Sequence, residues 1–296
     1  MNRLTLAAAA ALAVVCACTD DSAPTYTSDC LGLDETTAYD CLEARFWRTF
    51  QVDFDQRMSV YDLYQPVLDE HADYDDYDYR SRIVLRRGQL ALAISLENDP
   101  PNPAYWINLI SPDFDLAGEI NPDNPIAVSW KASIDMAIAH ITGDNDRAVQ
   151  IFNDAVDRIE AAPLGNVPSI SGTSIGMPLS TGVPERTIEL VDAWECRGVA
   201  WCSQNTEHGP WVMPGMAYHW AEHYARVGNR AKTVAFLDQA TSAPGYADWP
   251  YNWVVDDAVA DVDGLLDKFA AVGQDGSAFG LMYSNQKWGC KFCHAK

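Results

Sequence analysis

Apolar residues recur every three or four positions along much of the chain, the spacing that gathers them on one face of an α-helix. The pattern is clear at 130–142 and again at 144–156, and Gly143 separates the two stretches. The same arrangement returns at 215–240. Each stretch of this kind predicts two antiparallel helices joined by a tight turn at a glycine.

Other parts of the chain show the same periodicity. Helices are predicted within 39–69, at 80–97 and at 254–271. We therefore predict an all-α protein built from antiparallel helix pairs. In this division the N-terminal helical repeats occupy 30–163 and a C-terminal repeat occupies 213–296.

The second helix pair resembles a tetratricopeptide repeat. The residue types that this family prefers stand at Ala221, Tyr224, Gly228, Ala240 and Pro244. The first pair matches through Gly143, Ala148, Phe152 and Ala155, but it has Met136 where the family prefers a small residue. The resemblance implies a solenoid of stacked helix pairs, a scaffold that binds a protein partner. A generic pair of antiparallel helices is the alternative.

Residues 164–212 interrupt the helical pattern. The part at 164–184 is rich in Gly, Ser and Pro, which break helices. We expect an irregular insertion fastened by a disulfide between Cys196 and Cys202. Long loops on a helical scaffold either cover a ligand or form a plain surface loop, and both interpretations stay open.

The first residues resemble a bacterial lipoprotein signal. The apolar run at 4–15 is too short to span a membrane, and Cys16 and Cys18 follow it. The resemblance implies a signal peptide at 1–17, a lipid on Cys18 and a flexible tether at 18–29. It also implies export to the bacterial cell envelope, with the outer membrane as the expected site and the lipid as the only membrane contact. Secretion without a lipid is the alternative.

Charge narrows the choice of partners. The chain has 42 Asp plus Glu against 20 Lys plus Arg, a formal net charge of -22. Such a chain repels phosphate backbones, so we expect no nucleic-acid partner. With 48% hydrophobic residues, the chain has enough apolar side chains to form a core.

Cysteines of an exported chain meet an oxidising environment. Local pairing predicts one disulfide between Cys30 and Cys41 and a second between Cys196 and Cys202. Crossed pairings among these four cysteines stay open.

The most specific chemical motif is Cys290-x-x-Cys293-His294. This spacing is the attachment signature of c-type haem, in which two thiols one helical turn apart bind the macrocycle and the histidine ligates iron. Trp288 and Phe292 are expected to cover the haem. The second iron ligand could come from a cluster in the sequence, with His219 or His223 as the first choice and His208, Met213 and Met216 as the other candidates.

Other interpretations of this motif stay open. Cys290 and Cys293 could form a short disulfide, or they could join His219 and His223 in a Cys2His2 zinc site. A tail without any cofactor is a third interpretation.

Together these features predict an exported monohaem c-type cytochrome-like protein on a tetratricopeptide-like scaffold. Electron transfer, or binding through the haem, with a redox or other protein partner is what resemblance to c-type cytochromes implies. A non-enzymatic interaction scaffold with structural disulfides is the main alternative. A haem enzyme that uses Glu207, His208 and Glu222 would be a third class.

Overall fold

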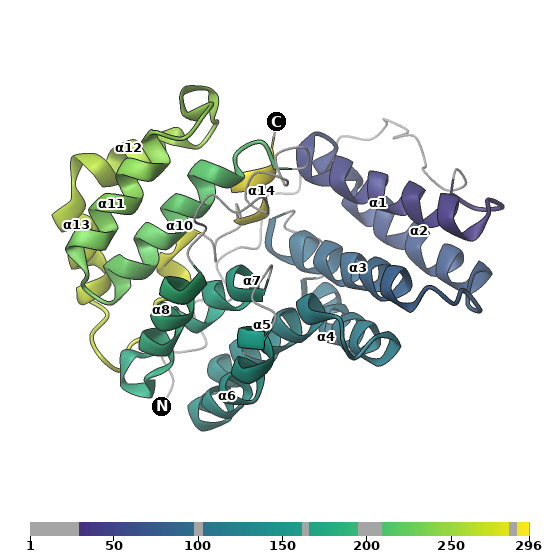
Figure 1. Cartoon of the computed structure of the whole chain (residues 1–296), viewed down its shortest axis with the longest axis horizontal. Coiled ribbons are helices and arrows are strands. Elements are labelled where there is room, and N and C mark those ends of the chain that lie inside the picture. The colour runs from purple at the N-terminus through teal and green to yellow at the C-terminus, as the bar shows by residue number, and fades with distance from the viewer. Residues whose placement is uncertain (1–29, 98–102, 162–165, 195–208, 284–288, 296) are drawn as a thin grey trace, which may run out of the picture.

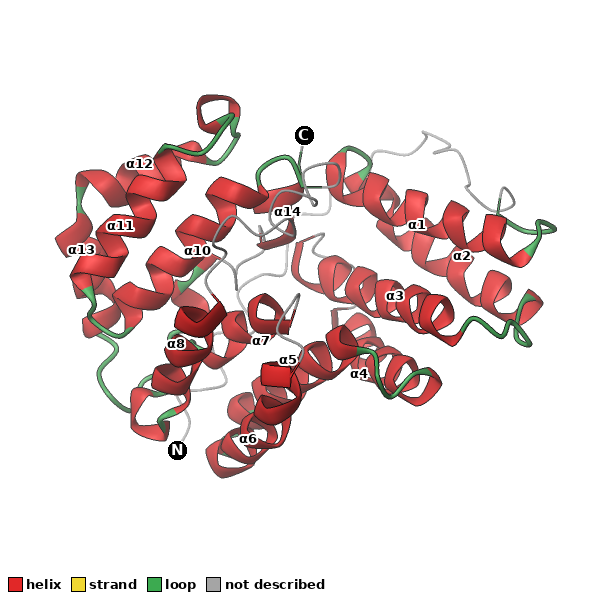
Figure 2. Cartoon of the chain, viewed as in Figure 1, coloured by secondary structure: helices red, strands yellow, loops and turns green. Residues whose placement is uncertain are grey.

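The computed structural model describes residues 30–97, 103–161, 166–194, 209–283 and 289–295. Within these ranges the chain is helical and forms no β-strand (Figure 2). The prediction of an all-α protein is therefore confirmed for the part of the chain that is described. No helix in these ranges has the length and apolarity needed to cross a membrane.

The N-terminal part consists of four helices in two contacting pairs. They are α1 (Glu35–Gln51), α2 (Arg57–Glu70), α3 (Tyr77–Glu97) and α4 (Pro103–Ile120). A disulfide joins Cys30 to Cys41 of α1, as predicted. Helices α3 and α4 approach closely at Gly88, where an added Cβ would lie 2.6 Å from Cε1 of Phe114. Small residues permit such close crossings.

The two helix pairs that the sequence pattern predicts both form. They are α5 (Pro125–Ile141) with α6 (Asn145–Ala161), and α10 (Val212–Arg226) with α11 (Arg230–Thr241). Gly143 and Gly228 turn the chain between partners with φ of 86° and 74°. Only glycine adopts this left-handed conformation without a steric penalty, which explains why the two turns fall there.

Residues 164–212 were predicted to be irregular, and this is wrong for two stretches. Residues Asn166–Ser174 form α7, and Val183–Trp194 form α8. Pro168 and Pro184 lie in the first turns of these helices, where a backbone N–H has no helical acceptor and proline is tolerated. Prolines that look like helix breakers in the sequence are therefore compatible with helix starts.

The single helix predicted at 254–271 is also wrong. The chain forms α12 (Asn252–Ala260) and α13 (Val262–Ala270) instead. Asp261 separates them, because its carboxylate accepts a hydrogen bond from the backbone N–H of Gly264 at 2.8 Å and so starts a new helix.

The helices follow one another in an arc, with α1 and α2 at one end and α11 to α13 at the other (Figure 1). Two hydrophobic cores result. The N-terminal core is built mainly by α1 to α4, and the C-terminal core surrounds α10. The short helix α14 (Gly289–His294) contacts both α1 and α10, so it lies between the two ends of the arc.

Candidate functional site

The Cys-x-x-Cys-His motif forms α14, and tryptophan side chains hold this helix in place. The indole N–H of Trp249 donates to the carbonyl oxygen of Phe292 at 2.7 Å. The backbone N–H of Trp211 donates to the carbonyl of Cys293 at 3.1 Å, and its indole N–H donates to the carbonyl of Ala295 at 2.5 Å. Carbonyls at the end of a helix have no partner within it, so these bonds satisfy groups that α14 leaves open.

Phe292 anchors α14 in the C-terminal core. Its ring is buried and lies within 4.6 to 5.9 Å of four other aromatic rings, centroid to centroid, which belong to Tyr218, Trp249, Tyr251 and Tyr283. Phe292 was predicted to cover a haem, and in this structure its contacts are with protein aromatics.

Cys293 packs against Gly215, a position of α10 that has no side chain. A Cβ added to Gly215 would be 2.5 Å from Sγ of Cys293, so only glycine permits this approach. Desolvation in this position raises the pKa of the Cys293 thiol to about 12, which keeps the group protonated at neutral pH. Gly215 was not among the predicted site residues, although a glycine inside a helical pattern can indicate close backbone approach.

Cys290 lies one helical turn earlier and packs against the N-terminal core, whereas Cys293 packs against the C-terminal core. Residues three apart on a helix are neighbours on its surface. The two thiols therefore lie at the seam between the cores and share one side of α14.

His294 faces α1. Its ring centroid is 5.4 Å from that of Trp47 and 6.2 Å from that of Phe50. The ammonium group of Lys291, on the same helix, lies 4.6 Å from the centroid of Phe54. The motif is thus held between two parts of the chain that are far apart in sequence.

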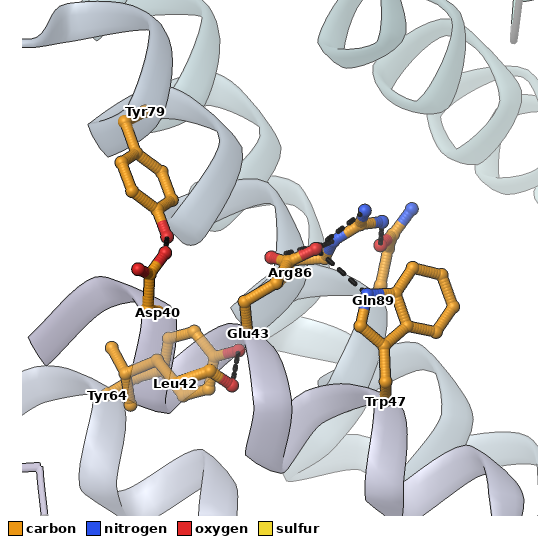
Figure 3. Close-up of polar contacts among 8 residues, drawn as sticks. All are labelled: Asp40, Leu42, Glu43, Trp47, Tyr64, Tyr79, Arg86 and Gln89. Carbon is orange, nitrogen blue, oxygen red and sulfur yellow. Dashed lines mark hydrogen bonds and ion pairs between the residues drawn. The ribbon is translucent and has the colours of Figure 1, made fainter. Parts of the chain in front are cut away.

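Trp47 is fixed by polar neighbours from two helices (Figure 3). Its indole N–H donates to Oε1 of Glu43 at 2.9 Å. Arg86 of α3 pairs with the same oxygen at 3.1 Å, and its guanidinium lies 4.7 Å from the Trp47 centroid. Arg86 also donates to Oε1 of Gln89 at 2.9 Å. We call Glu43, Trp47 and Arg86 the α1–α3 brace; no local sequence pattern indicates it.

His219 and His223 lie on α10, and both are buried. Nε2 of His219 is 3.4 Å from Oγ of Ser171, and Nδ1 of His223 is 2.7 Å from the carbonyl oxygen of His219. Burial lowers the pKa of His219 to about 3, and burial together with His219 holds the pKa of His223 well below its usual range. Both imidazoles are therefore neutral at neutral pH, the form that ligates metals.

The described residues do not gather these groups into one metal centre. His294 lies against α1, whereas His219 contacts α7 through Ser171. No group of three or more His, Cys, Asp or Glu side chains within the described ranges is arranged to hold a metal ion. Four of the predicted site residues lie outside those ranges: Cys18, Cys196, Cys202 and Trp288.

Comparison of the chain with protein-family models, with curated proteins and with solved structures gave no match.

Proposed function

We propose that this chain is a monohaem c-type cytochrome-like protein whose haem is attached to α14. The observation that carries the proposal is the placement of Cys290, Cys293 and His294 on a single helix turn between the two cores. This donor set fits covalent haem: two thiols form thioethers with the macrocycle, and the following imidazole ligates iron.

Haem attachment needs only the three groups that α14 itself carries. A structural zinc ion would need four ligands in one place, which requires His219 and His223 to approach α14. That difference favours haem over the zinc alternative. Bound haem would supply a one-electron redox couple, so the proposed activity is electron transfer or binding through the haem in the cell envelope.

The residues around the motif have separate tasks in this proposal. His294 is the ligand that α14 presents, and Trp211 and Trp249 hold the helix through its carbonyls. His219 or His223 remains our candidate for the second iron ligand, and either histidine would have to approach α14 to reach an iron held there. Export and a lipid on Cys18 complete the proposal, as does a protein partner bound to a tetratricopeptide-like scaffold.

The test is production of the chain in a host with c-type haem maturation machinery. We expect an intact mass increased by one haem and a pyridine haemochrome spectrum with thioether linkages. The Cys290→Ala/Cys293→Ala variant should lose both signals, while Cys196→Ala/Cys202→Ala serves as a matched double-cysteine control that keeps them. An unmodified mass in the maturation host contradicts the proposal.

A second candidate is an interaction scaffold without a cofactor. The packing of α14 favours this candidate. Cys293 already fills the space above Gly215, and tryptophan N–H groups already bind carbonyls of the helix. In that case the haem test fails, metal analysis finds no zinc, and the helix pairs carry the function by binding a protein.

A further inference from the structure

We propose that Trp47, held by Glu43 and Arg86, is the positioning residue for His294. The consequence for haem ligation rests on the proposed function, but the positioning itself is a property of the cofactor-free chain and is tested separately.

The indole ring of Trp47 contacts the imidazole ring of His294. Trp47 and His294 lie 5.4 Å apart, centroid to centroid, with a 41° angle between the ring planes. Phe50, one turn further along α1, contacts the same imidazole at 6.2 Å and 67°. Two rigid aromatic surfaces therefore limit the rotation of the histidine side chain on the side that faces α1.

Two polar side chains restrict the movement of Trp47 itself. Its indole N–H and one face are both engaged, the N–H by Glu43 and the face by Arg86 (Figure 3). The Glu43 and Arg86 side chains are 20% and 18% exposed, so their ion pair is shielded from much of the solvent. A partly buried, charge-assisted pair is stronger than an exposed one and fixes its geometry better.

The groups that hold Trp47 lie on helices outside the Cys-x-x-Cys-His motif. Glu43 and Trp47 are four residues apart on one face of α1, and Arg86 reaches them from α3. All three belong to the N-terminal part of the chain, whereas His294 belongs to α14. The orientation of the proposed ligand is therefore set by helices that carry none of the motif. Fixing a ligand through the groups around it is a general way to tune a metal centre.

The first experiment uses the cofactor-free chain. The ring current of Trp47 shifts the NMR signals of His294 carbon-bound protons, and we expect Trp47→Leu to remove that shift. Glu43→Gln keeps the indole but replaces the anionic acceptor, so it should reduce the shift. Trp130→Leu, a half-buried tryptophan on α5, is the matched control and should leave the His294 signals unchanged. Unchanged signals in Trp47→Leu would overturn the proposal.

The second experiment uses the haem-loaded chain. We expect Trp47→Leu to broaden or split the low-temperature electron paramagnetic resonance signal, because the His294 imidazole would adopt more than one orientation. Trp130→Leu should give the wild-type signal. If no haem attaches, the proposed function fails while the NMR result still decides the positioning. If haem attaches and Trp47→Leu gives the wild-type signal, the positioning is refuted.

Loss of fold would confuse both experiments, so each variant is compared by circular dichroism and thermal unfolding. Should Trp47→Leu fail to fold, Glu43→Gln and Trp47→Phe replace it. The Trp47→Phe variant keeps an aromatic surface but loses the N–H that holds it. A folded Trp47→Phe variant with wild-type His294 signals and a wild-type resonance spectrum contradicts the proposed role of the brace.

Discussion

Both cores contain buried polar side chains, and Arg87 of the N-terminal core has a different kind of partner from the histidines of α10 in the C-terminal core. In the N-terminal core, Arg87 of α3 donates from Nε and Nη2 to Oδ1 of Asp113 on α4 at 2.9 and 2.6 Å. These residues are 7% and 4% exposed. The α1–α3 brace adds a second, less buried ion pair. Opposite charges thus cross-link neighbouring helices.

On α10 in the C-terminal core, three buried basic side chains meet neutral partners. His219 and His223 are uncharged, and Arg226 donates to the backbone carbonyls of Phe269, Met177 and Gly276 at 3.4, 3.3 and 2.9 Å. Burial lowers the pKa of the Arg226 guanidinium. The Arg87–Asp113 contact in the N-terminal core therefore depends on paired charges, whereas His219 and His223 in the C-terminal core depend on remaining neutral.

Breaking the Arg87–Asp113 pair is expected to give the largest effect. Arg87→Met keeps much of the side-chain volume but leaves the Asp113 carboxylate buried without its cation. We expect a loss of about 3 to 5 kcal/mol in the free energy of unfolding, measured by urea denaturation. The double variant Arg87→Met/Asp113→Leu, which removes both charges, should recover most of the loss. A single variant as stable as the wild type would show that the pair does not hold α3 to α4.

Lowering the pH is expected to destabilise the C-terminal core. The folded-state pKa of His219 is about 3, whereas an unfolded histidine titrates near 6.5, so the unfolded chain binds more protons between these values. Stability contributed by neutral His219 is therefore complete above about pH 6.5 and is lost as the pH falls towards 3. At pH 4 the expected loss is about 3 kcal/mol.

The measurement is urea denaturation at pH 7 and pH 4, followed by tryptophan fluorescence. His219→Gln, which cannot be protonated, should show a weaker dependence on pH than the wild type. If both proteins lose the same stability between the two pH values, the histidine does not account for the acid sensitivity.

Much of this architecture follows from local sequence patterns. The helix pairs at α5 with α6 and α10 with α11 were predicted because the apolar period and the turn glycines agree. The Cys30–Cys41 disulfide followed from cysteine spacing. Helix α7 was missed because Pro168 breaks a helix in its interior but not in its first turn, and composition does not reveal where a helix starts.

The surroundings of the candidate site could not be predicted in the same way. The motif at 290–294 is local, so sequence alone identified it. Its contacts with Trp47 of α1 and Gly215 of α10 join residues far apart in the chain, and no periodicity encodes such contacts. Whether the two cores close around α14 depends on how all the intervening helices pack, and that is a property of the fold as a whole.

A substitution at Gly215 tests the contact between α14 and the C-terminal core. Gly215→Ala adds a Cβ 2.5 Å from Sγ of Cys293, so α14 must shift. We expect a loss of about 1 to 3 kcal/mol from overpacking, partly offset by the better helix propensity of alanine.

Gly118→Ala is the matched control, because Gly118 lies within α4 and no atom lies within 4 Å of its added Cβ. That variant should be as stable as the wild type or gain up to about 1 kcal/mol. Chemical denaturation of both variants gives the comparison, and equal stabilities for the two variants would mean that α14 does not rest on Gly215.

Removing one anchor of α14 is expected to give the smallest effect on global stability. Trp211→Phe eliminates the indole hydrogen bond to Ala295 but keeps the aromatic ring and the backbone N–H that bonds to Cys293. The expected cost is about 1 kcal/mol. Because the lost bond touches only the end of α14, hydrogen exchange should accelerate in 289–295 while α3 and α4 keep their protection. Trp253→Phe, a half-exposed tryptophan on α12, controls for general effects of the substitution. If exchange accelerates equally in α3, the end of α14 is coupled to the N-terminal core, and the expected local effect is refuted.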